Sequence, residues 1–182
     1  QHMVHQLDED GTAAIVVPHG VLFRGAAEGR IRQKMIEENL LDAVIGLPGN
    51  LFPTTNIPVA ILVFDRSREK GGAREQCKNV FFVDASREFV SGKNMNTLSE
   101  AHIGRIMETY AARDEEEKYA HVAEFAEIME NDFNLNIPRY VDTFEEEEEI
   151  DIDAVQKEID ELEKELAAVR VKMAEKLEEI QR

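Results

Sequence analysis

The sequence predicts an α/β fold that continues into a long C-terminal helix. Apolar runs without polar alternation, such as residues 12–17, are typical of strands covered on both faces of a sheet. Between two such runs, residues 28–39 show apolar side chains three and four positions apart, which indicates an amphipathic helix. After residue 150, apolar residues recur with the heptad spacing of a coiled coil.

The first third of the chain is predicted to form a strand, a helix and two further strands. Asp10 and Gly11 mark a turn before the strand at 12–17. The helix at 28–39 is expected to bury one side, made of Ile31, Met35 and Ile36. Two apolar runs follow, at 41–47 and 57–64. About nine residues separate them, too few for a parallel crossover, so these strands are expected to pair antiparallel.

Residues 66–130 alternate between polar and apolar stretches. Charges and two glycines in 66–78 predict a surface loop, and 79–85 predicts a strand. Ser99 is a candidate N-cap for a helix that ends at Ala112. A second short helix is predicted at 122–130. The apolar side of the first helix comprises Ile103, Ile106, Met107 and Tyr110.

The run of glutamates at 145–149 separates two parts, residues 1–144 and 145–182, because blocks of like charge favour an extended connector. The second part is predicted to be a helical assembly segment. Its apolar seam needs a partner helix, from another subunit or a second copy; the alternative is packing against its own domain. The seam consists of Ile152, Val155, Ile159, Leu162, Leu166, Val169 and Met173.

Composition restricts the classes of protein that this chain can represent. The formal charge of −17 includes 15 acidic and 6 basic side chains after residue 144, so neither part is basic enough to hold DNA phosphates alone. The single cysteine permits no internal disulfide. No apolar run approaches the roughly 20 residues of a membrane span. A cytoplasmic protein without membrane contact is therefore expected.

Three runs of sequence carry a family resemblance. They are PHGVLFRG at 18–25, LPGNLFPTTNIP at 47–58 and NDFNLNIPRYVD at 131–142. In this order they resemble the modification subunit of type I restriction-modification systems, which is an N6-adenine DNA methyltransferase, and the resemblance covers essentially the whole chain. It implies the C-terminal half of a Rossmann-like sheet of an S-adenosylmethionine-dependent methyltransferase.

The resemblance implies methyl transfer from S-adenosylmethionine to adenine in DNA. It also implies a complex with a specificity subunit, a restriction subunit and a second modification subunit. Two family motifs are missing here: the early glycine-containing turn that binds the methyl donor, and the Asn-Pro-Pro-aromatic motif that holds the adenine. We therefore expect the chain to be the C-terminal portion of such a subunit, inactive alone. The open edge of the strand at 12–17 would then favour self-association of the fragment.

Six residues in the three runs are candidates for contact with DNA. By resemblance, the loop at 47–58 supplies the aromatic surface against which the extruded adenine stacks, and Phe52 is its candidate; the alternative is a core side chain. The other five residues either approach DNA or order their loops by hydrogen bonding. Within the third run, Arg139 is the best candidate to bind a phosphate. These five are His19, Arg24, Asn136, Arg139 and Tyr140.

Other functions find less support in the residues. Gly20, Gly25 and Gly29 do not have the G-x-G-x-x-G spacing of a nicotinamide dinucleotide site. Apart from the pair His2 and His5 at the start of the chain, the histidines lack metal spacing, and Cys77 has no nearby histidine in the sequence, so neither a metal site nor a thiol enzyme is predicted. Two alternatives remain: a non-catalytic binding and assembly module of the restriction-modification complex, and an unrelated acidic coiled-coil protein.

Overall fold

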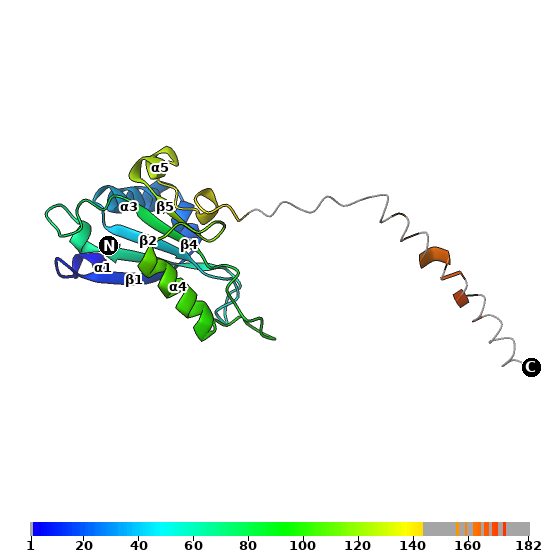
Figure 1. Ribbon diagram of the computed structural model, residues 1–182. Helices are drawn as coiled ribbons and strands as arrows, with labels where there is room; N and C mark the ends of the chain where they lie inside the picture. Colours follow the sequence, from blue (N-terminus) through cyan, green and yellow to red (C-terminus); the bar gives the residue numbers. More distant parts are fainter. Residues whose placement is uncertain are drawn as a thin grey trace, which may run out of the picture. The chain divides into compact units, whose positions relative to one another are not determined.

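The computed structural model describes residues 2–143 and ten further positions between 156 and 173. The chain divides into two units, Gln1–Phe144 and Glu145–Arg182. The elements of the first unit are drawn in Figure 1, which labels many of them. They are α1 (His2–His5), β1 (Thr12–Pro18), α2 (Gly20–Phe23), α3 (Ala26–Glu37), β2 (Leu41–Gly46), β3 (Val59–Asp65), η1 (Arg66–Arg68), β4 (Val80–Asp84), α4 (Glu100–Ala112), β5 (Ala120–Ala123), α5 (Phe125–Glu130) and η2 (Ile137–Arg139).

A five-stranded sheet with the order β1-β3-β2-β4-β5 forms the centre of the first unit. β3 pairs antiparallel with both β1 and β2, so the antiparallel pairing predicted from the short connection is confirmed. β2 and β4 pair parallel, and β5 pairs antiparallel with β4. Because β1, β2 and β4 run in the same direction, their carboxyl ends lie at one edge of the sheet.

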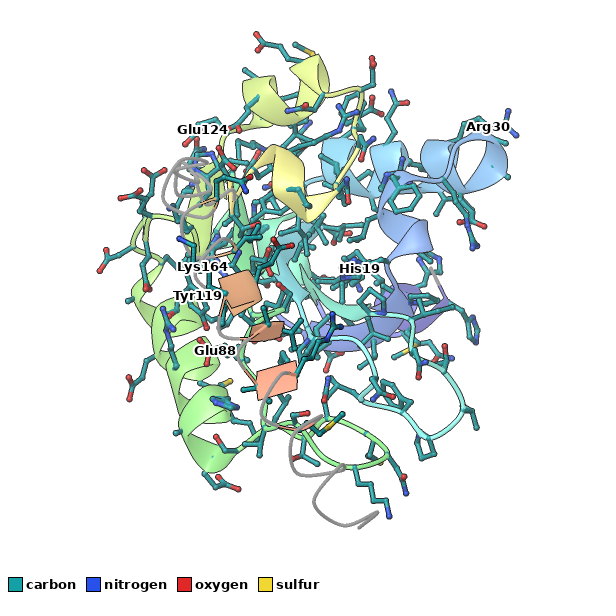
Figure 2. The ribbon with its side chains drawn as sticks, turned by 90° about the vertical axis from the view of Figure 1, so that its right-hand side faces the viewer. His19, Arg30, Glu88, Tyr119, Glu124 and Lys164 are labelled. Atoms are coloured by element: carbon teal, nitrogen blue, oxygen red, sulfur yellow. The ribbon has the colours of Figure 1, made fainter. Side chains whose placement is uncertain are left out.

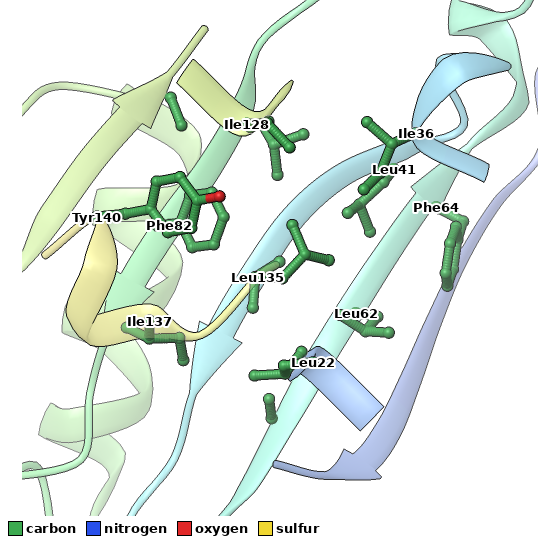
Figure 3. Close-up of a cluster of buried hydrophobic side chains, with 14 of the residues drawn as sticks. Leu22, Ile36, Leu41, Leu62, Phe64, Phe82, Ile128, Leu135, Ile137 and Tyr140 are labelled. Carbon is green, nitrogen blue, oxygen red and sulfur yellow. The ribbon is translucent and has the colours of Figure 1, made fainter. Parts of the chain in front are cut away.

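Helices cover both faces of this mixed α/β sheet. α3 and α5 lie on one face and α4 lies on the other (Figure 1). Figure 3 shows the core of the first face, where Ile36 of α3 and Ile128 of α5 meet Leu135 from the segment after α5. Ile106 of α4 belongs to the core of the second face. Full burial of side chains of this size stabilises the fold by roughly 1.5–3 kcal/mol each.

The prediction that both faces of the first strand are covered is wrong. β1 lies at the end of the sheet and its burial alternates along the strand, with Val16 54% exposed. Ile15 and Val17 face the core beneath α3, whereas α4 packs over β4, away from β1. Among the described strands β3 is the only neighbour of β1, and self-association through the outer edge stays a prediction.

Two helix predictions also need correction. Ser99 does cap α4, accepting a hydrogen bond from the amide of His102, but only Ile106 of the predicted apolar side is buried. Tyr110 is partly buried, while Ile103 and Met107 are exposed because they lie on the outer side of the helix. The helix predicted at 122–130 begins only at Phe125, since β5 pairs with β4 and this pairing overrides the local helical pattern.

Candidate functional site

Three connections meet at the edge where β1, β2 and β4 end. The first contains α2 and follows β1, the second spans residues 47–58 between β2 and β3, and the third follows β4 and leads to α4. Open α/β sheets bind their ligands beyond the carboxyl ends of their parallel strands. Two of the three motif runs therefore lie where a ligand is expected.

The loop at 47–58 is narrow and ordered by its own backbone. The amide of Asn50 bonds the carbonyl of Asn56 at 3.3 Å, and the amide of Thr55 bonds the carbonyl of Phe52 at 3.3 Å. Gly49 is required because a Cβ there would lie 2.8 Å from the Asn56 carbonyl oxygen, a backbone atom. The amide of Ile57 bonds the hydroxyl oxygen of Thr55 at 3.1 Å. These bonds fix the path of the loop around Phe52.

Phe52 presents its ring to solvent, whereas its neighbour Leu51 turns inward. Phe52 is 42% exposed, and Leu51 packs against the core beneath α4. Phe52 is therefore not a core residue in this chain. An exposed aromatic ring on an ordered loop offers a flat apolar face to a nucleobase, which is the kind of contact that holds a base outside the helix.

His19 lies at the same edge, directly after β1 (Figure 2). Its backbone amide bonds the carbonyl of Pro58 at 3.3 Å, which ties the end of β1 to the end of the loop. Burial lowers the pKa of the imidazole, and a hydrogen bond to the backbone of Val59 and the charge of Asp84 offset only part of that effect. Nε2 is buried without a hydrogen-bond partner among the described residues. The ring is consequently neutral near pH 7.

The two arginines beside α2 differ in their surroundings. Arg24 is exposed and lies 3.8 Å from Glu28 on α3. Arg32, which the sequence did not single out, is partly buried; its Nε donates to the carbonyl of Phe133 at 2.7 Å and its Nη1 to the carbonyl of Val21 at 2.9 Å. Arg32 therefore joins α3 to both α2 and the third motif run, and burial lowers its pKa.

The polar residues of 131–142 contact mainly one another and the sheet. Tyr140 is buried, and its hydroxyl donates to the carbonyl of Asn134 at 2.6 Å. The amide of Asn136 bonds the side-chain oxygen of Asn134 at 2.9 Å. Arg139 is exposed, and its Nη1 donates to the side chain of Asn131 at 3.2 Å. These bonds order the segment and leave the charge of Arg139 open to solvent.

A buried ion cluster lies at the opposite end of β2. Asp42 and Arg68 are both fully buried, and Nη1 of Arg68 donates to Oδ1 of Asp42 at 2.5 Å. Tyr110 of α4 and Arg113, the residue after that helix, donate to the other carboxylate oxygen at 2.7 and 3.0 Å. Arg74 completes the cluster at 3.2 Å. The prediction of a surface loop at 66–78 is thus wrong at Arg68.

The buried carboxylate explains why Arg68 leaves the surface. Burial by itself raises the pKa of Asp42, but the Tyr110 hydrogen bond and the charges of Arg113 and Arg68 outweigh it and hold the pKa below its ordinary value. The sequence did contain a signal, because a carboxylate within an apolar strand run requires a charged partner. The sequence alone does not identify which arginine is the partner of Asp42.

The described residues contain no cluster of three or more histidine, cysteine, aspartate or glutamate side chains that could bind a metal ion. None of the described helices has the length and apolar character needed to cross a membrane. Besides the carboxylate of Asp84, the groups available at the carboxyl edge are an aromatic ring, a neutral imidazole and exposed guanidinium groups. Such groups are suited to holding a base and contacting phosphate.

Comparison with known proteins assigns the family. The family model described as N-6 DNA Methylase matches residues 1–149. The chain belongs to the N-6 DNA methylase family. The type I restriction enzyme MpnII methylase subunit of Mycoplasma pneumoniae is 36% identical to this N-6 DNA methylase chain over 98% of the chain and 32% of the relative. The resemblance stated from the three motif runs is confirmed.

Solved structures agree with this assignment. The methyltransferase subunit of the type I restriction-modification system from Streptococcus thermophilus superimposes with a TM-score of 0.72 at 50% identity, covering 79% of this chain and 29% of that one. A chain from a structure on complex assembly and conformational transition of the type I system shares the fold, with a TM-score of 0.58 at 18% identity, 98% of this chain and 38% of that one. This N-6 DNA methylase chain spans about a quarter to a third of the length of its curated relatives.

The C-terminal seam is described at five of its seven positions. Ile152 and Val155 lie outside the described residues. The other five have helical backbone and expose about half or more of their surface, and they are Ile159, Leu162, Leu166, Val169 and Met173. Helical residues with exposed apolar side chains at heptad spacing are available for a partner helix, and the pairing itself stays a prediction.

Proposed function

We propose that this chain is part of a site-specific adenine-N6 DNA methyltransferase subunit of a type I restriction-modification complex. Membership of the N-6 DNA methylase family and the similarity to type I methylase subunits support this proposal. The substrates would be duplex DNA and S-adenosylmethionine, which supplies an electrophilic methyl group to the exocyclic nitrogen of adenine. The partners would be the specificity subunit, the restriction subunit and a second modification subunit.

The role of this chain in the reaction is to hold the extruded adenine. A base in a stacked duplex is inaccessible, so the enzyme must extrude it and compensate for its lost stacking. The observation that carries the proposal is the exposed ring of Phe52 on a loop whose backbone is already ordered. A loop that is already ordered before it binds the adenine loses less conformational entropy on binding. The exposed Arg24 and Arg139 are candidates for contact with the DNA backbone.

We propose that this chain does not by itself bind the methyl donor. Asp84 is the carboxylate at the carboxyl edge, and it already accepts the amide of Ser86 at 2.9 Å. The sequence contains no Asn-Pro-Pro-aromatic motif. We therefore assign no step of methyl transfer to side chains of this chain and expect the 182 residues alone to be inactive. Labelling of duplex DNA from labelled S-adenosylmethionine by the purified chain would contradict that expectation.

Substitution of Phe52 in the full-length subunit, assembled with its specificity subunit, tests the proposed role. Phe52→Leu keeps an apolar side chain but removes the aromatic face, and Phe52→Tyr keeps the face. Stacking of a base on an aromatic side chain is worth roughly 1–3 kcal/mol, so Phe52→Leu is expected to reduce methylation about 5- to 150-fold. Phe52→Tyr should retain most activity. Equal activity of both variants, with unchanged melting, would refute the stacking role.

The alternative of a non-catalytic assembly module is favoured by one observation, the exposed apolar side chains at the five described seam positions. The two functions are compatible, because residues 1–149 match the methylase model while the exposed seam positions lie beyond it. A Phe52→Leu complex that assembles normally and methylates poorly would assign catalysis to the first unit. A complex that methylates normally would leave assembly as the function of this chain.

A further inference from the structure

Asn96 fastens the loop of Phe52 to a distant part of the chain. Its side-chain amide donates to the carbonyl of Gly49 at 3.0 Å. Its backbone amide donates to the carbonyl of Asn50 at 2.8 Å. Both bonds act on the two residues that lead into Leu51 and Phe52, so they control the direction in which the chain enters the tip of the loop.

The segment that carries Asn96 is itself well anchored. Val90 and Thr97 exchange two backbone hydrogen bonds of 2.8 and 3.0 Å, which close a short hairpin. Leu98 packs against the same core as Leu51, beneath α4. Ser99 then caps α4. Asn96 is therefore held in place by the hairpin and by the core beneath α4, and its position does not depend on that of the loop.

The other side of the loop is held independently. The amide of His19 bonds the carbonyl of Pro58 at the end of the loop. Between these two attachments, the contacts of the loop within the part of the chain that the structure describes are its internal bonds and the inward packing of Leu51. Loss of the Asn96 side chain would thus remove one of the two bonds that hold the entry to Phe52, while the exit stays attached.

We propose that Asn96 is a positioning residue for base extrusion, which holds the Phe52 ring in the orientation that receives the adenine. This inference rests on the proposed role of Phe52. A side chain that orders a loop before the adenine binds lowers the entropic cost of binding that base. It acts through Phe52 and does not itself touch the substrate. Its removal should therefore affect the rate of transfer and leave the affinity for duplex DNA, which phosphate contacts dominate, nearly unchanged.

The first test measures the loop directly, by hydrogen exchange in the full-length subunit. Asn96→Asp is nearly isosteric and keeps the backbone bond, but it places a carboxylate against the Gly49 carbonyl. Asn96→Ala removes the side-chain bond without adding charge. Asn94→Ala, at an exposed position two residues earlier, is the matched control. We expect faster exchange at 47–58 in both Asn96 variants and not in the control. Unchanged exchange at the loop, or faster exchange throughout the sheet, would overturn the proposal.

The second test is a double-mutant cycle in methylation. Asn96→Ala should lower kcat roughly 3- to 10-fold, the range expected for the loss of one net hydrogen bond, with KM for duplex DNA unchanged. In a Phe52→Leu background the same substitution should have almost no further effect, because Asn96 acts through the ring. Independent, multiplicative losses would overturn the positioning role.

The two proposals can fail separately. If Phe52→Leu methylates like the natural sequence, the stacking function fails regardless of Asn96. If Phe52→Leu is impaired while the Asn96 variants methylate normally, only the positioning role fails. A loss of activity in Asn94→Ala equal to that in Asn96→Ala would also refute it, because the effect would then belong to the hairpin in general.

Discussion

The ring of Tyr140 lies flat on the ring of Phe82 in β4, with centroids 3.9 Å apart and an angle of 14° between the planes. This stack fastens the third motif run to the centre of the sheet. The hydroxyl of Tyr140 adds the hydrogen bond to Asn134 within the same run. A segment that is remote in sequence from β4 is thereby made part of the core on the face covered by α3 and α5, whereas Leu51 of the Phe52 loop packs against the core of the opposite face.

Truncation of Tyr140 should destabilise the first unit strongly. Tyr140→Ala removes a buried aromatic ring, and such changes cost about 3–5 kcal/mol. Tyr140→Phe keeps the stack and loses only the hydroxyl bond, with an expected cost of about 1 kcal/mol. Urea unfolding of both variants measures the difference. Equal costs would mean that the hydrogen bond, and not the stack, secures the segment.

The three tyrosines should resist ionisation in the folded chain. Burial is the main cause that raises the pKa of Tyr110, Tyr119 and Tyr140 to about 12. A raised folded pKa contributes stability that is fully present below the unfolded value of about 10 and is lost as pH rises through the folded value. Ultraviolet titration should therefore detect little phenolate near pH 10.5, and much in denaturant. A folded titration midpoint near 10 would contradict this prediction.

The Asp42 cluster predicts an acid limit to stability. Because the pKa of Asp42 is lowered in the folded chain, its contribution is present above the unfolded value of about 4 and is lost as pH falls through the folded value. Asp42→Asn leaves the buried Arg68 without a carboxylate and should cost about 3–5 kcal/mol near pH 7. Thermal melting as a function of pH measures both effects.

A matched control separates the buried pair from its partly exposed neighbour. Arg74 contacts the same carboxylate, but its side chain is 38% exposed. Arg74→Met should consequently cost less than Asp42→Asn, because Arg68, Arg113 and Tyr110 still contact the Asp42 carboxylate, and the main loss is the bond from Arg74 to Asp65. A cost for Arg74→Met as large as that for Asp42→Asn would show that burial of the pair is not what makes the cluster stabilising.

The C-terminal seam is tested by placing charges in it. Replacing Ile159 and Leu166 with aspartate in the full-length subunit should abolish association with the specificity subunit and leave the melting of the first unit nearly unchanged, since unpaired buried carboxylates are costly. Pull-down and thermal unfolding on the same double variant give both readouts. Lost stability with retained association would mean that the helix packs against its own domain.

The sequence predicted much of the local structure because local structure has local causes. The short connection after residue 47 was enough to predict the antiparallel pair of β2 and β3, and the side chain of Ser99 was enough to predict the start of α4. The three motif runs led to the family. Each of these features depends on residues that are close together in the chain, where spacing and side-chain chemistry limit the possible structures.

Tertiary structure decided the features that depend on distant pairing. Arg68 stands in a charged run and is buried only because Asp42, in a neighbouring strand, needs a cation. Residues 120–123 form a strand because they pair with β4. Val16 is exposed because α4 covers β4 and not β1. Asn96 holds the Phe52 loop across 46 positions of sequence. No periodicity encodes such contacts, because they arise only after the sheet has brought separate segments together.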